Sequence, residues 1–489
     1  MTHLLQKSAR AAQWSALDVL FRQGLQFAVS VVLARILLPT DFGIVALLSV
    51  FVAVASVFVD SGLGSALIQR RETTLADEST VFFFNLGIAV TTASLLAAAA
   101  PAIAAFFGQP VLVPLTYAMA LNLCINAFGT IHTTLLSKAL NFRIIAQAGG
   151  ISAAVAGVIA VTMAVQGYGV WSLAMHTIVA ALVNVVLLWK WHPWRPARTF
   201  RTASLRALLG FGGYEMAASL TDVFSNHLNL ILIGKLYSVG SVGLFDRAQR
   251  TQQLPTFLMM GVANRVAYSV FSAVSAEKTR LVNGLRKSQA VSMFVNVPIL
   301  LGMILLSDPL VATLYGQQWI ACAPILQVLG IGALLWPLHV LNLSALKAQG
   351  RTDLFFRITL LKKTVTISLI CLASLRGIMA MAWAQVLISL FAYFVNTHYT
   401  RVILGYGAWQ QLKDLSRIFI AAIPMAVTVY LANAMLPLPP AQKLGLAVLL
   451  GAAVHLAACR LLCRQLLHEC IVLTGLWERQ LRADGTGHP

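Results

Sequence analysis

The sequence predicts an all-α polytopic membrane protein of about 14 transmembrane helices. We expect two repeated six-helix lobes around a central cavity, followed by two additional C-terminal helices. Three observations lead to this prediction. Hydrophobic residues make up 59% of the 489 residues and charged residues only 10%, whereas a water-soluble domain has about 25% charged residues. Apolar runs of membrane-spanning length recur along the whole chain, and the first half of the chain resembles the second.

Each expected span is an apolar run long enough to cross about 30 Å of hydrocarbon, which takes roughly 20 helical residues. Polar residues interrupt the first and seventh runs, which makes these two the weakest. The expected spans are 13–36, 42–68, 82–107, 111–136, 145–166, 170–191, 207–235, 241–271, 287–307, 320–346, 356–375, 378–400, 416–436 and 444–467.

The repeat is visible as two pairs of matching segments. VVLARILLPTDFGIV (31–45) returns as ILIGKLYSVGSVGLF (231–245), 200 positions later and without a gap, which aligns Gly43 with Gly243. APAIAAFFGQ (100–109) returns as DPLVATLYGQ (308–317), at a shift of 208. A repeat of this length is a whole helical bundle, and duplicated halves are a recurring design of transporters. Chance similarity between apolar segments is the alternative.

The repeat and the loops predict the same division of the chain. Residues 1–205 form the first six-helix lobe with a basic linker, 206–410 the second lobe, and 411–489 two further helices and a cytoplasmic tail. The connections on the face opposite the termini, such as FGQP and QGYG, are too short for a folded domain. This argues against a membrane enzyme that acts on lipid-linked sugars at the outer face, and we expect no enzymatic activity.

The net charge of +19 follows mainly from membrane topology. The N-terminus, alternate loops and the tail hold 28 of the 35 Lys and Arg residues, whereas the opposite face holds Arg35, Lys235, Arg376 and Lys443. Because cytoplasmic loops of membrane proteins are enriched in Lys and Arg, this asymmetry places both termini in the cytoplasm. No nucleic-acid partner is needed to explain the charge.

Metal and cofactor signatures are missing from the sequence. The six cysteines lack the spacing of a zinc site, and we expect them to be packing residues. There is no glycine-rich phosphate loop, so we expect no nucleotide cofactor and a transport energy drawn from a gradient. His132, His176 and His339 lie within apolar spans, where histidine most often forms interhelical hydrogen bonds.

Polar residues form stripes inside two expected spans. In the span 207–235 they are spaced by three or four residues, which places them on one helix face: Glu215, Ser219, Asp222, Asn226 and Asn229. The first span carries a similar stripe of Ser15, Asp18, Arg22 and Gln26. The register of 200 aligns Arg22 with Asp222 and Gln26 with Asn226, so opposite charges occupy equivalent positions.

The neighbouring spans add Asp60, Asp246, Arg247 and Arg250. A charge that faces lipid costs about 3 kcal/mol on insertion scales, so these side chains must face an interior. One interpretation is a set of structural ion pairs, such as Asp18 with Arg22. The other is a polar central cavity. In that cavity Arg22, Arg247, Arg250, Gln26 and Asn226 bind an anionic substrate, and Asp222, Glu215 and Asp60 are the candidates for ion coupling.

Several segments together resemble a known family. They are ARILLPTDFGIVAL, FVDSGLGSALIQR, QGYGVWSL, the basic WRP linker, IGKLYSVGSVGLFDRAQ and LYGQQW, in this order. From about residue 8 to 400, the chain resembles the Wzx-type oligosaccharide flippases of bacterial polysaccharide synthesis. That family belongs to the multidrug/oligosaccharidyl-lipid/polysaccharide exporter superfamily. The shared segments are turn and packing signatures, so they transfer no catalytic residues.

The resemblance implies a function in the bacterial inner membrane. It implies movement of polyprenyl-pyrophosphate-linked oligosaccharide units from the cytoplasmic to the periplasmic leaflet, for exopolysaccharide, capsule or lipopolysaccharide O-antigen synthesis, driven by an ion gradient. The expected partners are the lipid-linked substrate, membrane lipids, and the polysaccharide polymerase and export machinery. A drug or small-cation antiporter of the same superfamily is one alternative, and a polymerase or ligase of lipid-linked glycans is another.

Overall fold

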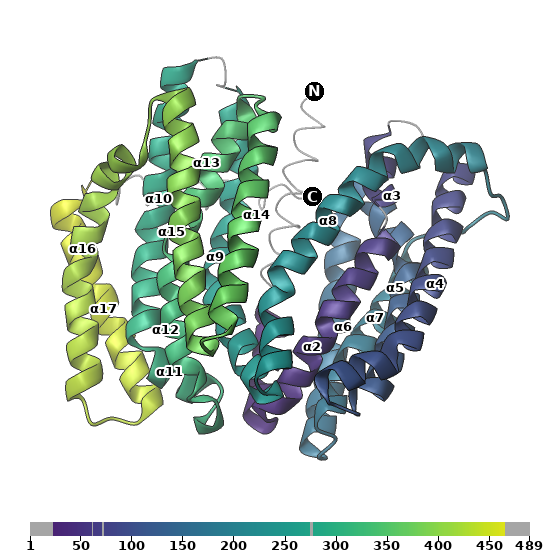
Figure 1. The fold of residues 1–489 in the computed structure, drawn as a ribbon, viewed down its shortest axis with the longest axis horizontal. Helices are drawn as coiled ribbons and strands as arrows, with labels where there is room; N and C mark the ends of the chain where they lie inside the picture. The colour runs from purple at the N-terminus through teal and green to yellow at the C-terminus, as the bar shows by residue number, and fades with distance from the viewer. Residues whose placement is uncertain (1–22, 61, 71–72, 274–276, 465–489) are drawn as a thin grey trace, which may run out of the picture. The chain divides into compact units, whose positions relative to one another are not determined.

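The computed structural model describes residues 23–60, 62–70, 73–273 and 277–464, and Figure 1 shows them as a protein of long helices. No β-strand occurs among these residues, and the all-α prediction is confirmed. In chain order the first helices are Gln23–Ile36, α2 (Pro39–Asp60), α3 (Leu63–Gln69), α4 (Leu75–Phe107), α5 (Leu112–Lys138), α6 (Phe142–Val165), α7 (Val170–Trp191) and α8 (Thr202–Leu236).

The second half of the chain is also helical. Its helices are α9 (Val239–Ala273), α10 (Lys278–Leu305), α11 (Ser307–Leu314), the short 3₁₀ helix η1 (Gln317–Trp319), α12 (Cys322–Ala333), α13 (Trp336–Ala348), α14 (Thr352–Ser374), α15 (Ile378–Leu404), α16 (Ala408–Met435) and α17 (Pro440–Leu462).

Two of the expected continuous spans are broken in the structure. The span 42–68 is divided into α2 and α3, because Gly62 adopts a left-handed conformation with φ of 65°. Such a backbone conformation is open to glycine and ends a helix. The span 320–346 is divided into α12 and α13, and Pro337 stands in the first turn of α13. Proline suits a helix start because it has no backbone N–H to donate.

Among the described residues, ten helices are long and apolar enough to cross a membrane. The expected spans 207–235, 241–271 and 356–375 coincide with α8, α9 and α14, which carry more charged residues. The described part of the first span is the shorter apolar helix Gln23–Ile36. A polytopic membrane protein is thus confirmed, whereas the number of 14 crossings stays a prediction.

The chain separates into two compact units, residues 1–246 and 247–489. Within the first unit, α8 packs against α2, α3 and α4, so it belongs by its contacts to the first six spans. The predicted boundary at residue 205 was drawn from the internal repeat, whereas the boundary at residue 246 follows from contacts. The boundary at residue 205 therefore stays a prediction.

The repeat register is visible where the starts of α2 and α9 cross. A Cβ atom on Gly43 would overlap the carbonyl of Val239, and one on Gly243 would overlap the carbonyl of Pro39. Pro39 and Val239 are themselves 200 positions apart, so the crossing is symmetric. Only glycine lets two helix backbones approach this closely.

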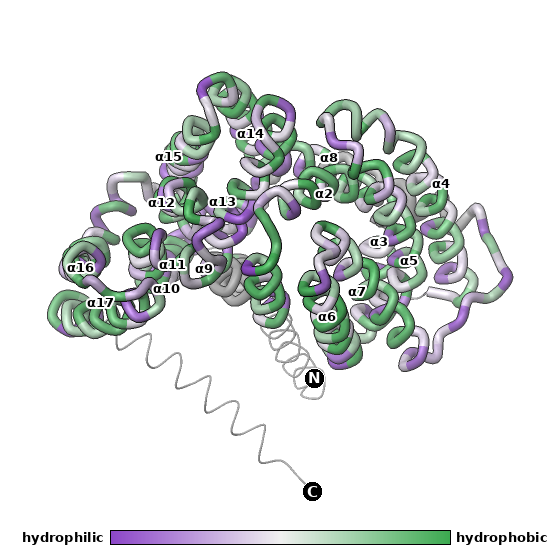
Figure 2. Tube along the Cα trace, turned by 90° about the horizontal axis from the view of Figure 1, so that it is seen from below, coloured by the Kyte–Doolittle hydropathy of each residue, from purple (hydrophilic) through white to green (hydrophobic). Residues whose placement is uncertain are grey.

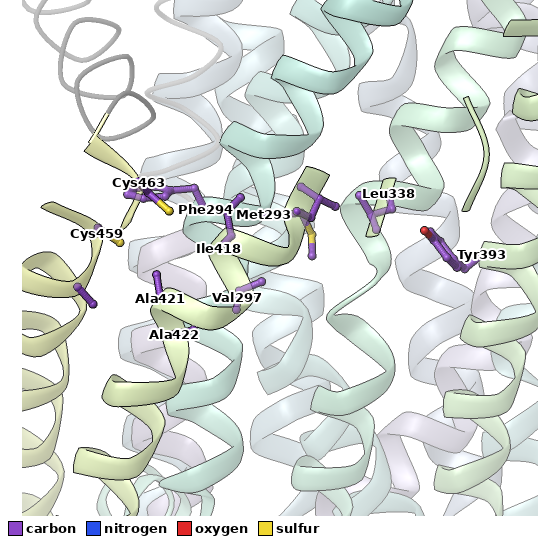
Figure 3. Close-up of a cluster of buried hydrophobic side chains, with 12 residues drawn as sticks. Met293, Phe294, Val297, Leu338, Tyr393, Ile418, Ala421, Ala422, Cys459 and Cys463 are labelled. Atoms are coloured by element: carbon purple, nitrogen blue, oxygen red, sulfur yellow. The ribbon is translucent and has the colours of Figure 1, made fainter. Parts of the chain in front are cut away.

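The C-terminal helices α16 and α17 share a hydrophobic core with α10 (Figure 3). Met293 and Val297 of α10 face Ile418 and Ala422 of α16, and Cys459 of α17 completes the cluster. Figure 2 shows hydrophobic residues along α16 and α17, with hydrophilic residues mainly in segments that connect helices. Of the cysteines expected to be packing residues, Cys322, Cys459 and Cys463 are buried and Cys124 is half-buried, whereas Cys371 is exposed. Cys470 lies outside the described residues.

Candidate functional site

The polar stripe of the span 207–235 lies on one side of α8. Asp222 and Asn226, four residues apart, are both exposed, whereas Asn229 is buried at 2% exposure. If α8 crosses the membrane as expected, an aspartate that faced lipid would cost about 3 kcal/mol, so a polar surrounding for this face stays a prediction. Glu215 also lies in α8, but its side chain is outside the described residues.

The partner residues from the first spans are only partly described. Gln26 is exposed on the helix Gln23–Ile36. Asp60 is the last residue of α2, and its side chain is outside the described residues. Arg22 precedes the described residues altogether. A joint site made by all the predicted residues therefore stays a prediction.

Arg247 and Arg250 on α9 have different environments. Arg250 is exposed. Arg247 is only 3% exposed, and its guanidinium lies 5.0 Å from the ring centre of Tyr315 and 5.4 Å from that of Trp319. Cation–π contacts of this kind are strongest where water is excluded. The two rings hold Arg247 in the packed interior of its unit, whereas Arg250 remains accessible.

Tyr315 and Trp319 belong to the LYGQQW segment between α11 and α12, and both are fully buried. The Tyr315 hydroxyl lies 2.8 Å from the hydroxyl of Thr251, one turn after Arg247 on α9. Burial raises the pKa of Tyr315, while the nearby Arg247 lowers it. This cluster fixes the LYGQQW segment to α9 and gives a physical reason for its sequence.

The internal repeat allows Arg247 to be compared with the equivalent residue of the first half. At the shift of 200, Arg247 is equivalent to Leu47, which is fully buried. At the shift of 208, Tyr315 is equivalent to Phe107, and Leu47 and Phe107 both pack around Gly234. The first unit thus fills this position with a leucine and the second with an arginine on aromatic rings. The equivalence favours a structural role for Arg247.

The WRP segment fixes the basic linker to the first unit. The Trp194 indole donates to the Glu78 carboxylate at 2.8 Å, and the Nδ1 atoms of His132 and His192 are 3.0 Å apart. Burial and the nearby Arg195 lower the pKa of His192, and Glu78 opposes this. When both rings are neutral, one Nδ1 carries a proton and donates it to the other Nδ1, which accepts. His132 of α5 was predicted to form an interhelical hydrogen bond, and its partner is instead His192, the first residue after α7.

A second polar cluster lies inside the unit 247–489 and was not identified from the sequence. Asn342 of α13 exchanges hydrogen bonds with Gln411 of α16 and accepts one from Thr400 of α15. Gln289 of α10 donates to the same Gln411. All four side chains are fully buried. Hydrogen bonds between buried amides specify how helices pack in a membrane.

Next to this cluster, the Lys362 ammonium of α14 donates to the Asn396 side chain of α15 at 3.2 Å. His339 of α13 lies 3.0 Å from the Ser389 hydroxyl of α15, which confirms its interhelical hydrogen bond. For His176 the structure shows no such bond among the described residues. The sequence places Lys362 within the expected span 356–375, although it is also one of the 28 Lys and Arg residues assigned above to the cytoplasmic side.

Among the residues that the structure describes, no group of three or more His, Cys, Asp or Glu side chains could hold a metal ion.

The sequence similarity of this chain to known proteins identifies its family. The sequence profile of the family described as "Polysaccharide biosynthesis protein" matches residues 32–324, which is more than half of the chain. The chain belongs to this family.

Individual relatives of this family member agree with the assignment over nearly the full chain. The teichuronic acid biosynthesis protein TuaB of Bacillus subtilis (strain 168) is 23% identical and covers 93% of this chain and 96% of its own. The lipopolysaccharide biosynthesis protein WzxC of Escherichia coli (strain K12) is 26% identical, covering 87% and 88%. The succinoglycan biosynthesis transport protein ExoT of Rhizobium meliloti (strain 1021) is 27% identical, covering 86% and 85%. The predicted resemblance to Wzx-type flippases is confirmed.

Solved structures show the same fold. The lipid II flippase MurJ, in an inward closed conformation, matches with a TM-score of 0.78 at 16% identity, covering 93% of this chain and 99% of its own. An inward-facing multidrug resistance transporter of the MATE family matches with a TM-score of 0.63 at 16% identity, covering 79% and 94%. The polysaccharide biosynthesis family member therefore has the flippase and exporter fold.

Proposed function

We propose that this protein is a flippase that moves lipid-linked oligosaccharide units across the bacterial inner membrane. The observation that supports the proposal is the near-complete match to relatives named for polysaccharide synthesis and transport, combined with the fold of a lipid flippase. The cargo is a polyprenyl pyrophosphate carrying a few sugars. The protein acts as a transporter without catalysis of its own, and it supplies the polysaccharide polymerase and export machinery with substrate.

The substrate pathway uses the charged side chains that cannot face lipid. Arg250 and the polar face of α8, with Asp222 and Asn226, are exposed in the structure. Together with Arg22 and Gln26 they provide cations and hydrogen-bonding groups for a pyrophosphate and its sugars. Arginine suits this role because its planar guanidinium binds phosphate oxygens in pairs and keeps its charge when desolvated. Asp222, Glu215 and Asp60 remain candidates for ion coupling.

The multidrug-transporter fold neighbour keeps a drug or small-cation antiporter as the second candidate. A cation pathway needs acidic and aromatic side chains, whereas α9 offers Arg250. A polymerase or ligase of lipid-linked glycans is a third candidate. It fits less well, because the short connections FGQP and QGYG leave no space for a catalytic domain on that face.

Both termini lie in the cytoplasm in this proposal. The support is the excess of Lys and Arg in alternate connections, which sets orientation through short loops. Periplasm-active reporters fused after Gln109, Gln317 or Pro439 are expected to be active, and fusions after Arg198 or Arg351 to be inactive. The reverse pattern would overturn the orientation.

Deletion of the gene tests the function in cells. We expect full-length lipid-linked oligosaccharide to accumulate on the cytoplasmic leaflet, because its assembly continues while its movement stops. The measurement is the fraction of that lipid accessible to a sugar-oxidising or hydrolytic reagent added to spheroplasts. If the units reach the periplasmic leaflet and fail only to polymerise, the protein is a polymerase. If their distribution is unchanged and drug resistance falls, it is an antiporter.

A further inference from the structure

Lys362 is a cation inside the helical unit 247–489, and the substrate pathway proposed above does not use it. It is the eleventh of 23 residues of α14, roughly 15 Å from the start of the helix at 1.5 Å per residue. Its side chain is half-buried. If α14 crosses the membrane as expected, the ammonium lies near the middle of the bilayer. Ionisable groups at this depth are costly and are usually functional.

The ammonium has an uncharged partner. Its Nζ atom donates to Oδ1 of Asn396, a fully buried residue of α15, at 3.2 Å. Within the described part of the chain, no carboxylate forms an ion pair with Lys362. The Asn396 amide nitrogen is buried and has no hydrogen-bond partner among the described residues. An amide oxygen stabilises an ammonium less than a carboxylate does, so the charge of Lys362 is only weakly held.

His339 of α13 is the other titratable group in this region. The Ser389 hydroxyl donates its only proton to the Gly332 carbonyl at 2.7 Å. The contact of 3.0 Å between His339 Nε2 and Ser389 Oγ therefore needs a proton on Nε2. The His339 Nδ1 atom is then a lone-pair acceptor, buried and without a partner among the described residues. A second proton on Nδ1 would leave a charged N–H buried without a partner, so the structure favours the neutral ring.

The helices packed on α14 bring few other charges. These helices are α13 and α15. Besides His339, their titratable groups are Lys347, which lies over the ring of Phe355, Tyr393, which donates to the Ala408 carbonyl, and His398, Tyr399 and Arg401 on the last two turns of α15. Neither α13 nor α15 carries an Asp or Glu residue, so these two helices stabilise the ammonium through dipoles such as the Asn396 amide.

We infer that Lys362, held by the Asn396 amide, is a proton-binding site that couples transport to a proton gradient. In each cycle the ammonium releases one proton to water on one side of the membrane, and the neutral amine takes up one proton from the other side. No other bond forms or breaks. Lysine can perform this exchange because its charge is lost readily in a desolvated site, whereas arginine stays charged. The inference rests on the proposed flippase function.

The test uses the purified full-length protein in vesicles that contain a polyprenyl-pyrophosphate oligosaccharide and a pH-sensitive dye in the lumen. The rate of oligosaccharide movement is measured with and without an imposed pH gradient, together with the proton flux. For the natural protein we expect the gradient to accelerate movement and protons to flow with it. For Lys362→Arg we expect oligosaccharide movement without proton flux. The rate of movement with the pH gradient should then equal the rate without it. Asn396→Asp should act in the same way, because a carboxylate beside Lys362 keeps the ammonium charged.

Lys363→Arg is the matched control, one residue along the same helix, and it should retain the gradient effect. Folding of each variant is checked by its elution as a monodisperse species in detergent. If Lys362→Arg keeps both the proton flux and the acceleration, the inference is wrong. It is also wrong if the natural protein moves oligosaccharide with no response to the pH gradient, although the proposed function then stands. If the natural protein moves no oligosaccharide at all, the proposed function fails as well.

Discussion

Replacing Gly43 or Gly243 by alanine is expected to cause a large loss of folded protein. A methyl group at either position would overlap the carbonyl oxygen of the opposing helix, Val239 in one case and Pro39 in the other. Backbone cannot rotate away as a side chain can, so α2 and α9 must separate at their starts. Overpacking of a tight interior costs about 1–3 kcal/mol even when side chains absorb it. The measurement is the amount of monodisperse protein and its midpoint of thermal unfolding in detergent.

Two other glycines provide matched controls. A Cβ atom on Gly87 of α4 or Gly302 of α10 would meet nothing within 4 Å. Alanine at these helical positions is expected to be neutral, or to stabilise by about 0.5–1 kcal/mol through the lower entropy of the unfolded chain. If all four alanine variants unfold at the same temperature, the close crossing of α2 and α9 does not exist in the folded protein.

Alanine substitutions of the two arginines of α9 are expected to have large but different effects, a loss of stability for Arg247 and a loss of export for Arg250. Arg247→Ala removes a side chain packed on Tyr315 and Trp319, and it leaves a cavity beside two buried rings. We expect a loss of about 3 kcal/mol in stability and little folded protein. Arg250→Ala truncates an exposed side chain. We expect normal amounts of protein and no polysaccharide export, with Arg250→Lys giving partial rescue because lysine cannot bind phosphate bidentately.

Conservative variants separate packing from binding at Arg247. Arg247→Leu copies the residue at the equivalent position of the first half, Leu47. If the role is structural, this variant should recover more folded protein than Arg247→Ala and keep some export. Normal amounts of protein in Arg247→Ala, together with lost export, would instead show that Arg247 contacts the substrate.

A double variant, Arg22→Ala with Asp222→Ala, tests whether Arg22 and Asp222 form a structural ion pair instead of binding substrate. Recovery of abundance and export in the double variant would identify an ion pair.

Much of the fold could be predicted from the sequence, because membrane helices reveal themselves through apolar length alone. The repeat register was informative beyond the count of spans, since it aligned Gly43 with Gly243 before the structure placed them together. The breaks between α2 and α3 and between α12 and α13 were not predicted. Each depends on one residue, Gly62 or Pro337, whose effect on backbone geometry is local and does not change hydropathy.

The candidate site was harder to predict for a physical reason. Helical spacing shows which residues share a face, but it does not show what covers that face. Arg247 and Arg250 are three residues apart and looked equivalent, yet two aromatic rings from the LYGQQW segment, Tyr315 and Trp319, cover only Arg247. Lys362 was assigned to a cytoplasmic group by its charge, because its partner Asn396 is identified only when α14 and α15 pack together.

The central claim is that this chain carries a lipid-linked oligosaccharide from one leaflet to the other. The most direct measurement is the leaflet distribution of such a lipid in vesicles with and without the purified protein, read out by a membrane-impermeant lectin or glycosidase. We predict that, with the protein present, oligosaccharide first shielded in the inner leaflet becomes accessible within minutes. An inner-leaflet fraction that stays shielded in vesicles holding folded protein, under a proton or sodium gradient of either direction, would contradict the account.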